Sequence, residues 1–192
     1  GLINYHNVET ITDMEDYISR LNQSNRYMLQ YLERAKLSVA DGIRAPYFDY
    51  DRAISEIQRV TSGAPFSEEG MSAIWEDITG KIESLVQEGV ATTEQADALE
   101  AQAREALLEN FKPAYDEVLA WLKEDRVNVP DEATGASELP DGDAYYAQRL
   151  QAMTTLPMTA REIHQLGLSE VARIQEEMQG IRLQVGFQGS LQ

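Results

Sequence analysis

Apolar residues recur every three or four positions along most of this chain, a spacing that is typical of one face of an α-helix. The first such stripe starts behind Thr12 and Glu15, which have the spacing of a capping box, and ends at Gly42. The Asn, Gln and Ser residues at 22–25 favour a break or bend, because such side chains compete for backbone hydrogen bonds. The apolar members of the stripe are Met14, Tyr17, Ile18, Leu21, Met28, Leu32, Ala35 and Val39.

Two shorter stripes predict two further helices. The first covers residues 49–63, where Asp49 is the expected N-cap, and the second covers residues 67–89. Both stripes end at a glycine, the residue that most often follows the last turn of a helix.

A longer stripe begins behind Thr92 and Gln95, a second pair with the spacing of a capping box, and continues to Trp121. Pro113 interrupts this stripe. A proline inside a helix removes a backbone hydrogen bond and crowds the preceding turn. We therefore expect a kink near Asn110.

The next segment predicts a connection followed by a short helix. Residues 126–140 contain two prolines and a glycine among polar residues and show no apolar period. Asp141 then has the character of an N-cap for the short helix behind it.

A third capping box, Thr159 with Glu162, opens a last helix that we expect to end near Gln184. One apolar seam runs along this helix, and we expect it to be buried against other helices, with Gly167 at a close helix contact. The seam consists of Ile163, Gly167, Val171, Ile174, Met178, Ile181 and Val185.

No stretch alternates apolar and polar residues over a length that predicts a strand, so the predicted fold class is all-α. We expect a multi-helix bundle in one helical domain over residues 1–192, with residues 126–140 as its internal connection. A chain of 192 residues, 43% of them hydrophobic, can bury a core without disulfides, and this one contains no cysteine.

The charge of the chain argues against one class of binding partner. The net charge is −17, which argues against nucleic acid, because Lys and Arg are not in excess to neutralise phosphates. Residues 64–125 hold 15 Asp plus Glu and 4 Lys plus Arg, so 4 − 15 = −11 of the charge lies there, which predicts a solvated helical face. No apolar run is long enough to span a membrane.

Residues suited to catalysis are few. His6 lies in an irregular start, where we expect an exposed side chain, and His164 follows an apolar residue, which favours a packed, hydrogen-bonding histidine. A zinc site of the H-E-x-x-H type needs a second histidine four residues on, but Leu168 occupies that position.

Residues 141–146 concentrate polar and aromatic groups. Asp141 and Asp143 are spaced like calcium-loop ligands, but Tyr145 occupies the fifth position of such a loop, so the helix-cap interpretation of Asp141 is preferred. The segment still offers more hydrogen-bonding groups than a helix start requires. A binding role for Tyr145 and Tyr146 and a capped helix with one core tyrosine both stay open.

The last third of the chain carries a set of distinctive motifs: Gly142 to Tyr146, Thr154 with Thr155, Ile163 to Leu168, Glu170 to Ile174 and Val185 to Ser190. Together these motifs closely resemble those of the bacterial domain-of-unknown-function family 885. Earlier in the chain, Asp16 with Tyr17 and the segment 112–115 also resemble that family.

The resemblance implies a long, mainly helical protein similar to zinc metallopeptidases of the thermolysin-like superfamily, with its H-E-x-x-P-G-H-H motif far downstream. This sequence lacks that motif. The resemblance therefore implies zinc in a longer parent protein and no cofactor in this chain. It also implies an exported, lipid-anchored protein of the cell envelope or periplasm, with a cytoplasmic location still open.

The functional expectation combines these points. The chain is an internal fragment, a helical non-catalytic portion that shapes the scaffold or substrate cleft of the parent, and its partners are the rest of the parent chain and a peptide substrate. The alternative is a stand-alone helical protein-interaction module without enzymatic role. The candidate substrate-binding residues are Asp141, Asp143, Tyr145, Tyr146 and His164.

Overall fold

The computed structural model describes residues 2–187 and 189, and over these residues it contains helices and no strand, which confirms the all-α fold class. One isolated β-bridge joins Ala64 to Met71. The chain divides into two compact units, Gly1–Ala133 and Thr134–Gln192, and the division falls inside the predicted connection. That the two units make one domain stays a prediction.

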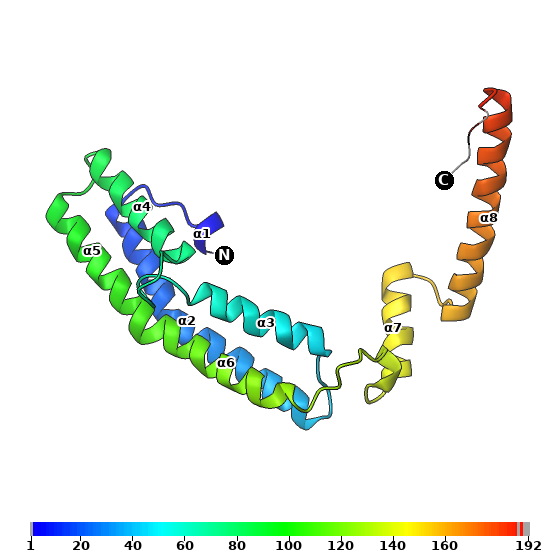
Figure 1. Ribbon diagram of the computed structural model, residues 1–192, viewed down its shortest axis with the longest axis horizontal. Coiled ribbons are helices and arrows are strands. Elements are labelled where there is room, and N and C mark those ends of the chain that lie inside the picture. The colour runs from blue at the N-terminus through cyan, green and yellow to red at the C-terminus, as the bar shows by residue number, and fades with distance from the viewer. Residues whose placement is uncertain (1, 188, 190–192) are drawn as a thin grey trace. The chain divides into compact units, whose positions relative to one another are not determined.

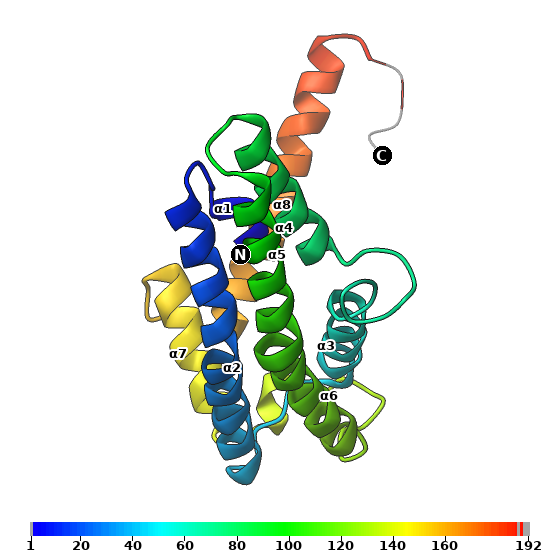
Figure 2. The ribbon, with the colours of Figure 1, turned by 90° about the vertical axis from the view of Figure 1, so that its left-hand side faces the viewer.

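The first unit is organised around two long helical runs that lie side by side (Figures 1 and 2). One run is α2, and the other consists of α5, the π-helical turn η1 and α6 in direct succession. The helix α3 packs on α6, and α4 packs on α5. The helices of this unit are α1 (Leu2–Tyr5), α2 (Ile11–Ala40), α3 (Tyr47–Val60), α4 (Ala73–Gln87), α5 (Thr93–Ala106), η1 (Leu107–Phe111) and α6 (Lys112–Arg126).

The core of this unit lies where α2, α4 and the α5–η1 run face one another. Each of these elements contributes the apolar stripe that the sequence pattern predicts. Burial of one large apolar side chain contributes roughly 1.5–3 kcal/mol, so these contacts set the packing of the unit. Its largest fully buried side chains are Tyr17, Met14, Leu21, Ile78, Leu85 and Leu107.

Near Asn110, where a kink is expected, the structure has the π-helical turn η1. Pro113 lies just behind it and has no N–H to donate, and a widened turn relieves the crowding that a proline ring causes. The turn keeps Leu107 and Phe111 buried. It also brings Asn110 Nδ2 within 3.0 Å of Asn22 Oδ1 on α2, to which it donates a hydrogen bond.

A break or a bend is expected at residues 22–25, and the break is wrong, because α2 runs through them without interruption. Two of these polar side chains find partners while the backbone stays helical: Ser24 Oγ donates to the carbonyl of Leu21 at 2.6 Å, and Asn22 accepts from Asn110. Buried Leu21 and Leu32 on either side hold the helix to the packed face.

Three predicted helix starts differ from those observed. The capping box of α2 is Thr10 with Asp13, one of two Thr-x-x-acid pairs in this segment, and Thr12 with Glu15 is the other. The helix α3 starts directly behind Pro46, so Asp49 lies in its first turn and does not cap it.

The helix α4 begins at Ala73 rather than near Ser67, because residues 63–72 form a closed loop. Within it the backbone N–H of Ala64 donates to the carbonyl of Gly70 at 2.9 Å, and that of Ser72 donates to the carbonyl of Ala64 at 3.1 Å. Ser72 then caps the helix by accepting from the N–H of Trp75. Gly63, with φ +81, allows the loop to close.

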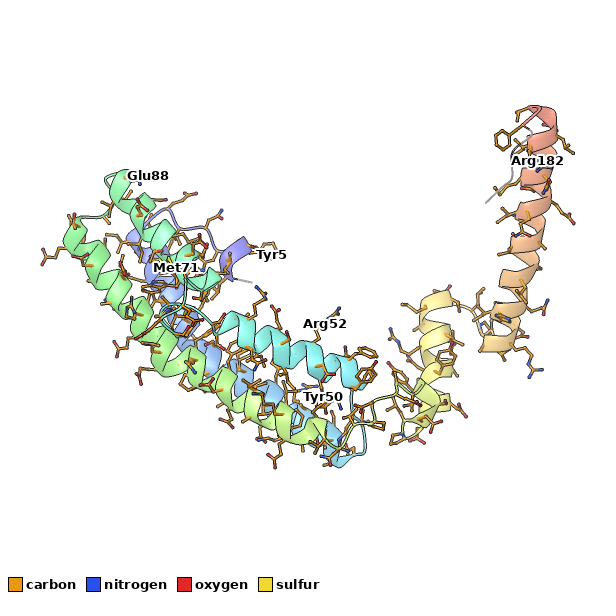
Figure 3. All side chains as sticks on the ribbon, in the orientation of Figure 1. Tyr5, Tyr50, Arg52, Met71, Glu88 and Arg182 are labelled. Carbon is orange, nitrogen blue, oxygen red and sulfur yellow. The ribbon has the colours of Figure 1, made fainter. Side chains whose placement is uncertain are left out.

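A buried carboxylate joins the loop after α2 to α3 and α6. Asp125 accepts hydrogen bonds from Arg44 Nε and Nη2, at 3.0 and 2.9 Å, and from the hydroxyl of Tyr50 at 2.7 Å. Figure 3 labels Tyr50 on α3. The Arg44 guanidinium holds the pKa of Asp125 below its usual value. Burial, and then the hydrogen bond to Asp125, raise the pKa of Tyr50.

The second unit contains η2 (Ala136–Glu138), α7 (Gly142–Thr154) and α8 (Ala160–Gln184). The capping box Thr159–Glu162 is confirmed at the start of α8. The prediction that the α8 seam is buried is wrong: Val171, Ile174, Met178 and Ile181 are 54%, 44%, 45% and 58% exposed.

The seam is exposed because no described element of the second unit packs along α8. The expected close contact at Gly167 is also absent, since a Cβ built there meets no described atom within 4 Å. The family-like end of the chain is only partly described, because Gln188 and Ser190 lie outside the described residues.

Replacing Asp125 by Asn should lower the free energy of unfolding by roughly 1–3 kcal/mol at pH 7, because it removes the charge from the hydrogen bonds that Asp125 accepts in a partly exposed ion pair. The folded-state pKa of Asp125 is lowered, so this contribution is complete above the unfolded value near pH 4 and is lost as the pH falls through the folded pKa. Urea unfolding at pH 7 and at pH 2.5 should show the difference from wild type shrinking at low pH.

The matched control is Asp97→Asn, at an exposed aspartate on α5. It should change stability by no more than about 0.5 kcal/mol at either pH. Equal effects of the two substitutions at pH 7 would contradict a stabilising role for the Asp125 cluster.

Candidate functional site

The structure places the five predicted binding residues in the second unit, on α7, at its entrance and on α8. Asp141 directly precedes α7, but its side chain makes no cap hydrogen bond, so the preferred helix-cap interpretation is wrong. The reason is its backbone: φ 54 and ψ 26 are left-handed, whereas an N-cap side chain reaches the first turn from an extended conformation.

Gly142 explains how α7 starts without that cap. A Cβ at this position would overlap the carbonyl oxygen of Ala136, so the backbone of α7 approaches η2 as closely as only glycine permits. This contact fixes the first turn of α7, which carries Asp143, Tyr145 and Tyr146.

One side of α7 borders a hollow of about 340 Å³, here called the α7 hollow. Asp143, Tyr146 and Leu150 face it from positions i, i+3 and i+7 of the helix, and residues 157–160 close its other side. Of the five predicted residues, the structure brings Asp143 and Tyr146 together in this lining. Asp141, Tyr145 and His164 lie outside it, and the expectation that His164 is packed is wrong, because its side chain is exposed.

The threonine pair at the end of α7, its last residue Thr154 and its C-cap Thr155, shapes the far wall of the α7 hollow. Thr154 Oγ1 donates to the carbonyl of Leu150 at 2.8 Å and accepts from the backbone N–H of Leu156 at 3.3 Å. Thr155 takes a left-handed conformation with φ 60. The chain thereby turns back and places Pro157 against the face of α7 that bears Tyr146.

The chemistry available at the α7 hollow is binding. A carboxylate accepts hydrogen bonds, and a phenol presents an apolar face and an O–H donor. A peptide offers matching amide donors and carbonyl acceptors. The substrate-binding role of Asp143 and Tyr146 stays a prediction.

A second and larger hollow, of about 770 Å³, lies in the first unit and is called here the large hollow. Buried Ile74 and Phe111 and partly buried Met28 and Val60 give it an apolar lining. Met71, which is 55% exposed, lies at its rim in the loop before α4 (Figure 3). Sequence reasoning missed this hollow because segments far apart along the chain build it.

Charged groups of α3 line one side of the large hollow. Arg59 Nε donates to Glu56 Oε2 at 3.0 Å, and this hydrogen-bonded pair lowers the pKa of Glu56. The phenol of Tyr115 lines the hollow as well, and burial, followed by the charge of Glu56, raises its pKa.

A third hollow, of about 290 Å³, shares the lining residues Leu2, Ser24 and Tyr27 with the large hollow and therefore adjoins it. We call it the arginine hollow, because Arg20 and Arg26 line it. Its other lining residues are Gln23 and Gln30.

His6 helps to position Arg20. The expectation that His6 is exposed is wrong, because its side chain is only 8% exposed. Its Nε2 donates to the carbonyl of Asp13 at 2.9 Å, and its Nδ1 accepts from Arg20 Nη1 at 2.8 Å, since a guanidinium can only donate. The ring also packs on that of Tyr17, with centroids 5.1 Å apart.

Tyr17 continues this network into the core. It is fully buried, and its hydroxyl donates to Asp77 Oδ2 at 2.8 Å, while Lys81 Nζ binds the same carboxylate at 2.7 Å. Burial and the hydrogen bond to Asp77 raise the pKa of Tyr17. These contacts join α2 to α4. Tyr17, one of the two residues of the family-like Asp16–Tyr17 pair, therefore has a structural role.

The described residues do not fit a zinc site. Among them, no three or more His, Asp or Glu side chains are grouped so as to hold a metal ion. No described helix combines the length and the apolar composition that a membrane crossing requires.

Comparisons with known proteins confirm the resemblance read from the motifs. The model of a family described as "Bacterial protein of unknown function (DUF885)" matches residues 1–192. A solved structure described as "The crystal structure of the putative lipoprotein from Colwellia psychrerythraea" superposes with a TM-score of 0.78 at 24% identity, which shows the same fold. The match covers 98% of this chain and 31% of that one. No curated protein matches the chain.

Replacing Gly142 by Ala should loosen the start of α7 and destabilise it by roughly 1–3 kcal/mol, because the new methyl group would overlap the carbonyl of Ala136. Hydrogen exchange at the amides of residues 142–146 should become faster.

The matched control is Gly180→Ala on α8, where the new Cβ meets no described atom within 4 Å. Exchange in α8 should become slower there, because alanine favours a helix over glycine by about 1 kcal/mol. Unchanged exchange at residues 142–146 in Gly142→Ala would contradict the close packing of α7 on η2.

Proposed function

This chain belongs to the bacterial family of unknown function DUF885, and we propose that it is a helical, non-catalytic portion of a longer parent protein of that family. In this proposal the chain shapes the scaffold or the substrate cleft of a parent similar to zinc-dependent peptidases. The rest of the parent chain is its main partner, and a peptide is the substrate.

The observation that carries this proposal is the exposed apolar seam of α8. Val171, Ile174, Met178 and Ile181 repeat at steps of three and four, and each is more than 40% exposed. A contiguous apolar patch of this kind marks an interaction surface. This chain corresponds to 31% of the lipoprotein chain that shares its fold, so in a protein of that length other segments are available to cover the seam.

The metallopeptidase part of the proposal rests on the resemblance in sequence motifs. The described residues of this chain do not form a metal site, so side chains outside it would hold the zinc, which would activate the hydrolytic water. The contribution of this chain would be to bind and orient the peptide. The α7 hollow is the candidate place, with the Tyr146 hydroxyl as donor and Asp143 as acceptor.

A cell-envelope location completes the proposal. It is supported by the description of the structural neighbour as a lipoprotein.

The alternative is a stand-alone interaction module that receives a helix of another protein. The same seam favours it, because steps of three and four are the pattern by which helices pack into one another. The two functions differ in what covers α8: a segment of the same polypeptide, or a separate protein.

The substitution Ile174→Ala tests whether the rest of the parent protein covers the α8 seam. In this 192-residue chain Ile174 is 44% exposed, so the substitution should change the free energy of unfolding by no more than about 0.5 kcal/mol. In the parent, where the seam would be buried, the loss should be roughly 2–5 kcal/mol. Denaturant unfolding of both proteins measures the two values.

The control is Gln175→Ala, the neighbouring residue outside the seam, which should have a small effect in both proteins. An equally small effect of Ile174→Ala in the parent would overturn the scaffold proposal and favour the interaction module.

Tyr146→Phe tests the cleft role in the full-length parent. Loss of the hydroxyl should lower kcat/KM for metal-dependent peptide hydrolysis by up to about tenfold, the equivalent of one hydrogen bond, while thermal stability is kept. Tyr145→Phe is the matched control, because Tyr145 lies outside the α7 hollow, and it should leave hydrolysis unchanged. Equal effects of both substitutions on hydrolysis would contradict a binding role for Tyr146 and would indicate that residues 141–146 are purely structural.

A further inference from the structure

We propose that the adjoining hollows of the first unit bind the C-terminal end of an apolar peptide. The free carboxylate lies at Arg20 and Arg26 in the arginine hollow, and the last apolar side chains lie in the large hollow. This site goes beyond the proposed function, which assigns no role to either hollow.

The large hollow has the character of a ligand site. Its volume of about 770 Å³ falls in the range of pockets that hold small molecules and short peptides, roughly 300–1,000 Å³. Its floor is the buried pair Ile74 and Phe111, and flexible Met28 and Met71 can adapt to side chains of different shape.

The charges around both hollows favour a ligand with one negative charge. Arg59 is paired with Glu56, which leaves Arg20 and Arg26 against Glu76. This local excess of one positive charge stands out in a chain with a net charge of −17. A guanidinium binds a carboxylate through two parallel hydrogen bonds, so two arginines suit a terminal carboxylate.

Arg20 is held in place before any ligand arrives. Its Nη1 donates to His6 Nδ1 at 2.8 Å, and His6 is itself fixed by the carbonyl of Asp13 and the ring of Tyr17. Pre-ordering of a binding group reduces the entropy that binding would otherwise cost.

The neutral groups of the arginine hollow favour a peptide over a fatty acid. The amides of Gln23 and Gln30 and the hydroxyl of Ser24 can each donate and accept hydrogen bonds, as the peptide group of a ligand does. The tail of a fatty acid offers no partner for them. Tyr27, which lines both hollows, joins the polar site to the apolar one.

The proposed function bears on this site only through the class of ligand, a peptide. Binding at the hollows needs neither zinc nor the rest of the parent. Its failure and the failure of the parent to hydrolyse peptides can therefore be observed separately.

The probe is the peptide Ala-Ala-Leu-Phe with a fluorescein label at its N-terminus, and the measurement is fluorescence anisotropy with the 192-residue chain. The peptide with a free C-terminal carboxylate should bind about tenfold more tightly than the same peptide with a C-terminal amide, because only the carboxylate forms charge-assisted hydrogen bonds with the arginines.

Arg26→Gln should reduce the difference in affinity between the acid and the amide, because only Arg20 then remains to bind the carboxylate. Met71→Glu, at the apolar rim, should weaken the binding of both peptides by roughly tenfold. Arg52→Gln is the matched control: Arg52 is an exposed arginine on α3 outside both linings (Figure 3), and its loss should change neither affinity. Circular dichroism and thermal unfolding verify that each variant is folded.

Equal affinity for the acid and the amide, or full retention of acid binding by folded Arg26→Gln, would overturn the proposal. Dodecanoate serves as the competitor that carries the same charge on a different tail. If it displaces the peptide at a lower concentration than unlabelled Ala-Ala-Leu-Phe does, and Arg26→Gln weakens it, the site belongs to a fatty acid and the peptide assignment is wrong.

Discussion

The packing of α2 against the α5–η1–α6 run is the interaction on which the first unit depends. Both runs bring an apolar stripe to the interface, and the fully buried side chains Leu21 and Leu107 belong to the core that the two runs share with α4. The π-helical turn keeps the second run in contact past Pro113, where a regular helix would be disrupted. The other helices attach to this pair: α4 through Tyr17 and Asp77, and α3 through its contact with α6. The large hollow exists because α1, α3 and α4 rest on the pair without filling the space between them.

Sequence periodicity predicted most of the helices because it reports directly which face of a helix is apolar. It placed their starts less well, because Thr10 with Asp13 and Thr12 with Glu15 have the same spacing, and only the folded chain selects between them. It also predicted a buried seam on α8 that the structure exposes. An apolar pattern indicates that a face needs a partner and does not say whether the described chain supplies it.

The candidate sites show the same boundary between local and tertiary information. The proximity of Asp143 and Tyr146 could be predicted from the sequence, because a separation of three residues places them on one face of α7. The large hollow could not be predicted in this way, since Leu2 and Tyr115 come to line the same space only after the whole unit has folded. His6 is the clearest case: an irregular start predicts exposure, whereas contacts with Asp13 and Arg20, residues of the next helix, bury it.

The energetics of α8 explain why its seam matters. Its capping box contributes about 1 kcal/mol, and the pairs of Arg173 with Glu170 and Glu177 add roughly 0.2–0.5 kcal/mol each. Gly167 and Gly180 each cost about 1 kcal/mol relative to alanine, so these local terms nearly cancel. A helix in this position draws most of its stability from packing of its apolar face. Because no described element of its unit covers that face, the burial energy of the seam is available for association, and it is this energy that a scaffold or an interaction module would use.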